Sequence, residues 1–296
     1  MKKILALALI LALLSSALTS CALAEEKLVM TSFYPIYLIA RNVLHDVEGV
    51  RLQNLTAPTT GCLHDYQLLA GDVRALAEAD ALVINGAGME HYLDALTAQL
   101  PALPLVDCSL DIALLPDEED GGMNAHIWLD PQNAAKMTEN MAAGLAEILP
   151  EHAAQIHQNA AAYAETLRAL DAEIRESLKD LASRDIVTFH EAFPYFAQAY
   201  DLNVVAVVAV EADEALSPRE LSLVADKILA AGCPPLFTEP QYAADAAVIL
   251  HNETGAPVFE LDPLVTGDGA LSAYEDGMRK NAETLKPALG AGTVGE

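Results

Sequence analysis

Three histidines and one aspartate have the chemistry of ligands for a metal ion: His64, His126, His190 and Asp262. Imidazole nitrogens and a carboxylate oxygen suit four-coordinate Zn2+, which holds such atoms at about 2.0–2.2 Å. Mn2+ is a harder ion and more often recruits a second carboxylate. A single histidine of this kind is better explained as a hydrogen-bonded polar residue. It is the set of four that predicts a metal site, with Zn2+ favoured and Mn2+ as the alternative.

A secreted zinc metallohydrolase would use the same residue types differently. Its zinc keeps one position for water, and Glu191 or Asp65 would act as the general base. A site with four protein ligands is closed, and the sequence contains no H-E-x-x-H motif. We therefore expect a binding protein and not an enzyme. The other histidines are expected on or beside helices, away from the site: His45, His91, His152, His157 and His251.

Short apolar runs alternate with helix-like stretches in both halves of the chain. In the first half, strands are predicted at 27–32, 50–55, 81–84 and 103–107, and helices at 36–44, 66–79 and 89–100. In the second half, strands are predicted at 185–189, 204–210 and 258–261, a further segment at 235–238, and helices at 192–200, 218–231 and 243–254. This alternation indicates mainly parallel sheets covered on both faces, so the predicted fold class is α/β with two lobes.

One long helix is predicted between the two halves. Residues from 151 to 183 contain no Gly or Pro and place apolar side chains at helical spacing, among them Ile156, Tyr163 and Leu167. Such a helix is roughly 45 Å long at 1.5 Å per residue. We interpret it as a rigid connection between the lobes, and a helix buried within one large domain is the alternative.

The four candidate ligands fall where parallel sheets bind ligands, beyond the carboxyl ends of strands. His64 follows the loop after the second predicted strand, and His126 follows the acidic loop 116–122. His190 and Asp262 each come directly after a predicted strand. Two ligands come from each half, so we expect the metal site in the cleft between the lobes.

The N-terminus has the pattern of a secretory signal peptide, with two lysines before an apolar run. Segment 18–21 (LTSC) resembles the bacterial lipobox, in which the cysteine becomes a lipid-modified first residue. We therefore expect a lipoprotein signal over residues 1–20 and a lipid anchor on Cys21, which would hold an extracytoplasmic protein at the membrane surface. Cleavage after Ala24 is the alternative and would leave a periplasmic protein. The apolar run is shorter than the roughly 20 residues that span a bilayer.

The acidic composition argues against nucleic acid as a partner. The formal net charge is −27 over 296 residues. Removing residues 1–20 takes away two lysines and no acidic residue, so the charge becomes −29. Nucleic-acid binding requires a cationic face. We expect a monomeric protein with an acidic, well-solvated surface.

Three cysteines remain once Cys21 is assigned to the anchor: Cys62, Cys108 and Cys233. Their spacing matches no zinc-finger pattern. An odd number does not pair completely, and a disulfide between Cys62 and Cys108, which both lie in the first half, is left open.

Seven short segments carry a resemblance to a known family: 31–35 (TSFYP), 61–66 (GCLHDY), 81–86 (ALVING), 124–131 (NAHIWLDP), 189–196 (FHEAFPYF), 238–241 (TEPQ) and 261–264 (LDPL). In these segments and their order the chain resembles the zinc and manganese solute-binding proteins of bacterial ABC transporters (cluster A-I, ZnuA/TroA-like). The resemblance covers nearly the whole chain after the signal.

The resemblance implies two α/β lobes joined by one rigid helix, with the metal held between them by residues aligning with the four candidate ligands. The predicted organisation is an N-terminal lobe over 21–149, a connecting helix over 150–183 and a C-terminal lobe over 184–296. The family's zinc binders generally carry His at the third ligand position and many manganese binders carry Glu, so His190 favours zinc. The implied partner is an ABC transporter permease, and a surface adhesin with the same fold is the alternative.

The chain departs from the family pattern in three places. Leu63 stands where Pro commonly precedes the first histidine, and Ala125 stands where a pair such as Asp-Pro often precedes the second. The acidic loop 117–122 replaces the His-rich loop of some zinc members and is interpreted as solvated. None of these differences removes a predicted ligand.

Overall fold

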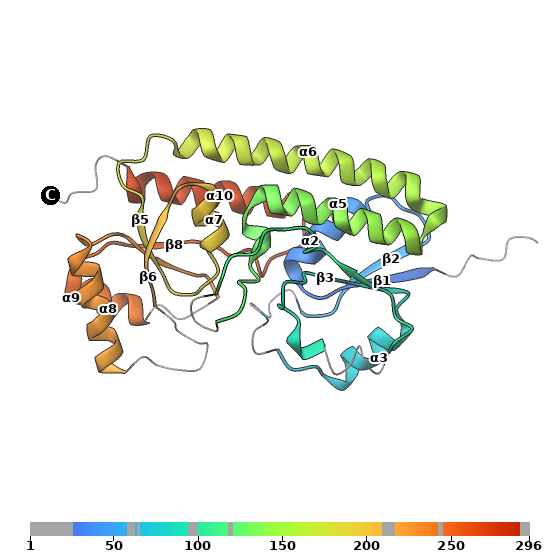
Figure 1. Ribbon diagram of the computed structural model, residues 1–296, viewed down its shortest axis with the longest axis horizontal. Coiled ribbons are helices and arrows are strands. Elements are labelled where there is room, and N and C mark those ends of the chain that lie inside the picture. Colours follow the sequence, from blue (N-terminus) through green and yellow to red (C-terminus); the bar gives the residue numbers. More distant parts are fainter. Residues whose placement is uncertain are drawn as a thin grey trace, which may run out of the picture.

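Two four-stranded sheets of parallel strands form two lobes that lie side by side (Figure 1). The computed structural model describes residues 26–57, 63, 66–93, 100–117, 121–208, 217–241 and 245–290. The strand order is β2-β1-β3-β4 in the first sheet and β6-β5-β7-β8 in the second. The two lobes therefore share one topology, which confirms the predicted α/β fold.

The sheet of the first lobe separates two apolar clusters. Val29 packs into the central core, whereas Leu28 and Met30 pack on the opposite face with Leu76 of α3. This alternation follows from the two-residue period of a strand. The elements of this lobe are β1 (Lys27–Thr31), α2 (Tyr34–Val43), β2 (Val50–Asn54), α3 (Ala70–Glu78), β3 (Ala81–Ile84), the 3-10 helix η1 (His91–Leu93), β4 (Leu105–Asp107) and the 3-10 helix η2 (Ile127–Leu129).

The sheet of the second lobe divides its apolar side chains in the same way. Ile186 packs into the central core, and Val187 packs on the other face with Ile228 of α8. Ser217 caps α8 by accepting a hydrogen bond from the Glu220 backbone at 3.3 Å, as its position before Pro218 indicates. The elements are β5 (Asp185–Thr188), α7 (Pro194–Ala199), β6 (Asn203–Val207), α8 (Pro218–Ala230), β7 (Leu236–Thr238), α9 (Asp245–Thr254) and β8 (Val258–Glu260).

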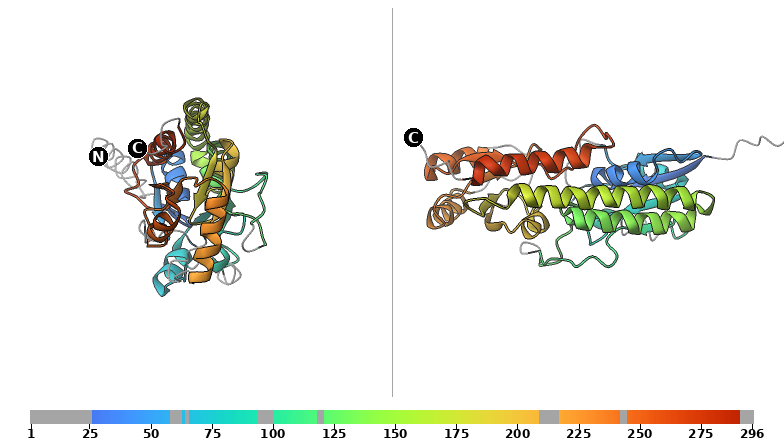
Figure 2. Two further views of the ribbon diagram at one scale, coloured as in Figure 1. Left: turned by 90° about the vertical axis from the view of Figure 1, so that its left-hand side faces the viewer. Right: turned by 90° about the horizontal axis from the view of Figure 1, so that it is seen from above.

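The predicted long helix is present as α6 and runs over both lobes (Figure 1). Its 26 residues span about 39 Å. It packs against α2 and α5 of the first lobe and against α10, which follows the second lobe, and Figure 2 shows this helical layer from above. The elements of the layer are α5 (Pro131–Ile148), the 3-10 helix η3 (Pro150–His152), α6 (Ala153–Leu178) and α10 (Ala273–Leu289).

One apolar core runs through both lobes beneath α6. It contains Val83 and Trp128 from the first lobe, Ile186 and Phe196 from the second, and Ile174 from α6 itself. The long helix is therefore more than a bare connection, because its inner face is buried in a core that the two lobes share. The domain boundaries at 149/150 and 183/184 stay predictions.

Two helices of this layer, α5 and α10, are absent from the sequence-based prediction. Both contain residues that ordinarily interrupt helices: Gly144 in α5, and Gly277 and Pro287 in α10. A Cβ atom at residue 144 would lie 2.7 Å from a methyl carbon of Val106, so the glycine allows β4 to pack close to α5. Packing thus overrides the local preference.

Other predicted elements differ in length. The helix predicted at 66–79 begins at Ala70. Of the helix predicted at 89–100, the structure describes a 3-10 turn at His91–Leu93, and residues 94–99 lie outside the described part. The helix predicted at 150–183 starts with the separate 3-10 turn at Pro150–His152 and ends at Leu178.

The structure bears on three expectations about the membrane and the cysteines. The predicted signal peptide and Cys21 lie outside the described residues. Within the described part of the chain, no helix combines the length and apolar character needed to cross a bilayer. Cys108 is a buried free thiol, and Cys62, the partner in the disulfide left open, lies outside the described residues.

Candidate metal centre

The rings of His126 and His190 meet where the two lobes face each other. Their centroids lie 4.8 Å apart and their planes are nearly perpendicular, at 86°. His126 directly precedes η2 of the first lobe, and His190 follows β5 of the second. His126 is 1% exposed, and 15% of the His190 side chain is exposed. Two of the four predicted ligands are therefore brought together across the lobes.

Asn124 orients the ring of His126. The Asn124 Oδ1 atom accepts a hydrogen bond from the His126 backbone N–H at 3.0 Å and lies 3.2 Å from His126 Nδ1. The Asn124 Nδ2 atom donates to the carbonyl oxygen of Glu191 in the other lobe at 2.7 Å. An amide oxygen only accepts, so the contact with Nδ1 is a hydrogen bond in the form of the ring that has its proton on Nδ1.

Glu239 lies beside the ring of His190 at ion-pair distance. Its Oε1 atom is 3.3 Å from His190 Nδ1, and its side chain is fully buried. His190 follows β5 and Glu239 follows the neighbouring strand β7, at the position where the strand order of the sheet reverses. Ligands commonly bind at such a position. A carboxylate next to a ligand histidine fixes the ring and increases its basicity.

Trp128 connects the histidines to the loop that carries Asp262. Its ring lies 5.2 Å from that of His126 and packs edge-on against Phe33 at 5.1 Å. Its Nε1 atom donates to the carbonyl oxygen of Pro263 at 2.8 Å, and its own carbonyl oxygen accepts from the Tyr274 hydroxyl at 2.6 Å. The fully buried indole therefore fixes the residue after Asp262 against the first lobe.

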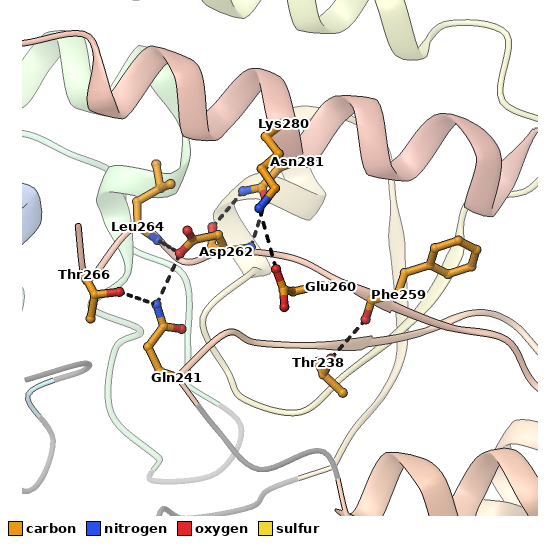
Figure 3. A network of polar contacts seen from close by, with 9 residues as sticks. All are labelled: Thr238, Gln241, Phe259, Glu260, Asp262, Leu264, Thr266, Lys280 and Asn281. Atoms are coloured by element: carbon orange, nitrogen blue, oxygen red, sulfur yellow. Dashed lines mark hydrogen bonds and ion pairs between the residues drawn. The ribbon is translucent and has the colours of Figure 1, made fainter. Parts of the chain in front are cut away.

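Asp262 follows β8 and is held by the side chains of Asn281 and Gln241 and by the backbone N–H of Leu264 (Figure 3). Its backbone N–H donates to Asn281 Oδ1 at 2.8 Å, and its carbonyl oxygen accepts from Asn281 Nδ2 at 2.7 Å. Its Oδ1 atom accepts from Leu264 N at 2.8 Å and from Gln241 Nε2 at 3.4 Å. Gln241 Nε2 also donates to Thr266 at 2.9 Å. The backbone of Asp262 is thus held by two short hydrogen bonds, and its carboxylate by one short hydrogen bond and one longer contact.

Leu264 closes the tight turn after Asp262 in a left-handed conformation, with a φ of 61°. Its side chain is buried against α10 at Gly277, where an added Cβ atom would lie 2.2 Å from a Leu264 methyl carbon. The glycine inside α10 therefore serves the turn that positions Asp262.

A second buried carboxylate supports the peptide that precedes His126. Glu90 is 6% exposed and accepts hydrogen bonds from the backbone N–H groups of Asn85 at 2.7 Å and Gly86 at 3.1 Å. Burial raises the pKa of Glu90 to about 7, an effect that these hydrogen bonds offset only in part. The Asn85 side chain in turn donates to the carbonyl oxygen of Ala125 at 2.9 Å.

The structure treats the four predicted ligands differently. His126 and His190 are in contact, and His64 lies outside the described residues. Among the residues that the structure describes, no three His, Cys, Asp or Glu side chains are close enough to hold a metal ion together, so Asp262 does not join the two histidines. Of the other histidines, His251 lies in α9 with Nδ1 2.8 Å from the Ala256 carbonyl oxygen.

Two residues of this centre received no role from the sequence: Asn124 and Glu239. Both lie within the segments that carry the family resemblance. The available signals were an amide two residues before a candidate ligand, and an acid directly after a buried strand. Neither signal shows which residue the side chain contacts. Asn124 reaches His126 around a turn and Glu191 from the other lobe, and Glu239 reaches His190 from a neighbouring strand.

Comparisons with known proteins identify the family and the fold of the chain. The family model ZnuA, described as zinc-uptake complex component A, periplasmic, matches residues 29–288. The chain is 31% identical to the iron-binding protein YfeA of Yersinia pestis, over 93% of each chain. It is 30% identical to the zinc-binding lipoprotein AdcA of Streptococcus pneumoniae serotype 4, over 97% of this chain and 61% of AdcA. The structure of the solute-binding protein FpvC of Pseudomonas aeruginosa in complex with Mn2+ matches with a TM-score of 0.80 and 25% identity, over 89% of this chain and 98% of FpvC. The names of these relatives include three different metals.

Proposed function

Because the chain belongs to the ZnuA family of metal-binding solute-binding proteins, we propose that it captures Zn2+ outside the cytoplasm and delivers it to an ABC transporter permease. The proposed ligands are His64, His126, His190 and Asp262. In this role the metal is cargo, and the protein binds it without catalysing a reaction on it. The family consists of solute-binding proteins and not enzymes, which argues against the metallohydrolase alternative.

The observation that carries the proposal is the contact between His126 and His190 across the two lobes, with 4.8 Å between ring centroids. Each ring has its Nδ1 atom close to a side-chain oxygen, 3.2 Å from Asn124 and 3.3 Å from Glu239. This arrangement directs Nε2 as the ligand atom of both rings. Histidine ligands with such orienting partners are a regular feature of metal sites.

Asp262 would join the histidines through its carboxylate. Its contact with Gln241 is 3.4 Å long, the longest in its network, whereas the bonds to its backbone are 2.7–2.8 Å. A metal ion would therefore replace the contact with Gln241 while the backbone stays in place. The shared core beneath α6 supports the expectation that the lobes move little when this happens.

Zinc is proposed over manganese because three of the four ligands are imidazoles. Iron and manganese both occur in the names of similar proteins, and Mn2+ is the alternative to Zn2+ that the titration tests. Protons compete with the metal for imidazole nitrogens, and we expect affinity to fall as the pH drops below about 6.5. A lipid anchor on Cys21 completes the proposal and is supported by the lipoprotein name of the relative AdcA.

A competition titration tests the proposal. The metal-free protein is titrated with Zn2+ and Mn2+, separately and together, and the bound metal is measured by elemental analysis. We expect one saturable site per chain that retains Zn2+ in the presence of Mn2+. Preferential retention of Mn2+ would correct the metal, and the absence of a saturable site would reject the function.

A double variant tests the ligands themselves. His190→Ala combined with Asp262→Ala is expected to abolish tight Zn2+ binding. The matched control combines His152→Ala with Glu151→Ala, a surface histidine and acid 3.9 Å apart, and should bind like the natural sequence. Unchanged affinity in the first variant would contradict the ligand assignment.

A further inference from the structure

One side-chain amide connects the loops of both central histidines. Asn124 is fully buried and contacts His126 through Oδ1 and the carbonyl oxygen of Glu191 through Nδ2. Glu191 is the residue after His190, so the amide spans from one lobe to the other. We propose that Asn124 is a positioning residue that selects the Nδ1–H tautomer of His126 and fixes this ring relative to the His190 loop. Its effect on metal binding rests on the function proposed above.

The orientation of the amide follows from its partners. A backbone carbonyl only accepts hydrogen bonds, so the group 2.7 Å from Glu191 O is the amide nitrogen. The amide oxygen then faces His126, where it accepts from the backbone N–H at 3.0 Å. Rotating the amide by 180° would place two acceptors together on one side and two donors together on the other. The surroundings therefore hold one orientation.

The orientation of the amide determines the tautomer of the ring. The His126 Nδ1 atom lies 3.2 Å from an oxygen that only accepts, so the stable neutral form has its proton on Nδ1. Its Nε2 atom then has the lone pair that a metal ion requires. In the opposite tautomer two lone pairs would face each other in a buried environment, which is unfavourable. Asn124 thus prepares His126 as an Nε2 ligand before the metal arrives.

The backbone of Asn124 is fixed as well. Its carbonyl oxygen accepts from the Tyr195 hydroxyl at 2.8 Å, and its N–H donates to Leu115 O at 2.8 Å. The same hydroxyl accepts from Leu115 N at 2.9 Å. Tyr195 belongs to α7 of the second lobe. The Asn124 backbone is therefore held by contacts from both lobes, and this fixes the position from which its side chain reaches His126 and Glu191.

Two variants separate the two contacts. Asn124→Asp keeps an acceptor for His126 Nδ1 but loses the donor to Glu191, whereas Asn124→Leu loses both. We expect Asn124→Leu to weaken Zn2+ binding by about 10- to 100-fold, the usual effect of losing an orienting partner, and Asn124→Asp to weaken it less. The control is Asn140→Leu, because Asn140 also donates to two carbonyl oxygens, those of Cys108 and Leu110, without contacting a histidine. It should lose stability but not affinity.

The decisive measurement needs no metal and begins with the natural protein. Long-range 1H–15N correlation spectra of the metal-free natural protein at about pH 8, above the ordinary histidine pKa of about 6.5, report the tautomer of each imidazole. We expect His126 as the Nδ1–H form, the same form in Asn124→Asp, and a mixture in Asn124→Leu. An Nε2–H form in the natural protein would overturn the proposal. If the tautomer is as expected but Zn2+ does not bind, the proposed function fails and the role of Asn124 stands.

Discussion

The carboxyl ends of β3 and β7 occupy the same place in their sheets, and each is followed by a buried glutamate that serves a different purpose. Glu90, after β3, accepts hydrogen bonds from two backbone N–H groups of its own loop. Glu239, after β7, lies 3.3 Å from the ring of His190. The same topology thus places Glu239 beside the proposed ligand His190 in the second lobe. In the first lobe, Glu90 is linked to the peptide before His126 only through Asn85, by two successive hydrogen bonds.

The two lobes therefore support the histidines of the centre through different contacts. In the first lobe a neutral amide contacts His126, and the carboxylate acts indirectly through Asn85 and the carbonyl oxygen of Ala125. In the second lobe the carboxylate lies directly beside the proposed ligand His190. A direct carboxylate partner increases ligand basicity, whereas the indirect one only supports the backbone. Changes at Glu239 should therefore affect metal affinity more, and changes at Glu90 should affect stability more.

The largest expected effect comes from removing a ligand in either lobe. His126→Ala and His190→Ala should each lower Zn2+ affinity by about 1,000-fold or more, or about 4 kcal/mol, because losing an orienting partner alone is worth about 10- to 100-fold. Competition with a chelator of known affinity measures both. His251→Ala is the control and should bind normally. A large effect in one lobe only would show that the lobes do not share the ion.

Glu90 should make the free energy of unfolding depend on pH. Its pKa of about 7 in the folded protein exceeds the ordinary value of 4.5, so the folded state holds this proton more tightly. The stabilisation is complete below about pH 4.5 and is lost as the pH rises through about 7, a decrease of about 3 kcal/mol. Urea unfolding without metal, followed by fluorescence of the single tryptophan, measures it from pH 5 to 8.

The matched variant is Glu90→Gln, which has no carboxyl group to titrate. Its free energy of unfolding should be lower than that of the natural protein at pH 5, and this difference should narrow by about 3 kcal/mol as the pH approaches 8. Parallel pH profiles for the two proteins would show that Glu90 titrates normally.

Glu239→Gln should have an effect of intermediate size, and this effect should be on Zn2+ affinity. The variant retains an oxygen that faces His190 but loses the negative charge, so Zn2+ affinity should fall by about 10- to 100-fold, or about 1.4–2.7 kcal/mol. Calorimetric titration of Glu239→Gln and Glu90→Gln side by side compares the lobes directly. Equal losses in the two variants would remove the distinction between the two glutamates.

The smallest effect is expected for two buried tyrosine hydroxyls. Tyr195 contacts the Asn124 and Leu115 backbone, whereas Tyr274 donates to Trp128 O and not to Asn124. Tyr195→Phe and Tyr274→Phe should each lower the free energy of unfolding by about 1 kcal/mol. Only Tyr195→Phe should also weaken Zn2+ binding, by less than about tenfold. Thermal unfolding and metal titration of both variants check this pair.

Much of the fold follows from local patterns. Seven of the eight strands in the described part of the chain were predicted within a few residues, because apolar runs such as 81–84 and 185–188 are bounded by polar or turn-forming residues, and the eighth falls in the unassigned segment 235–238. Helix α8 was predicted with its cap because Ser217 and Pro218 are a local signal. Helices α5 and α10 were missed because Gly144, Gly277 and Pro287 are unfavourable locally, and the two glycines lie where a neighbouring side chain packs closely against the helix.

The metal centre was likewise predicted from the sequence only in part. The sequence by itself determined the candidate ligand types and, for His190 and Asp262, their places at strand ends, because a strand and the residue that follows it are read from neighbouring positions. Only the tertiary structure decided that His126 meets His190, that Glu239 turns to one of these rings and that Asn124 joins both loops. These contacts connect residues far apart in the chain, and their geometry depends on the burial of both lobes around one core. The roles of His64 and Asp262 at the metal stay predictions for the titrations described above.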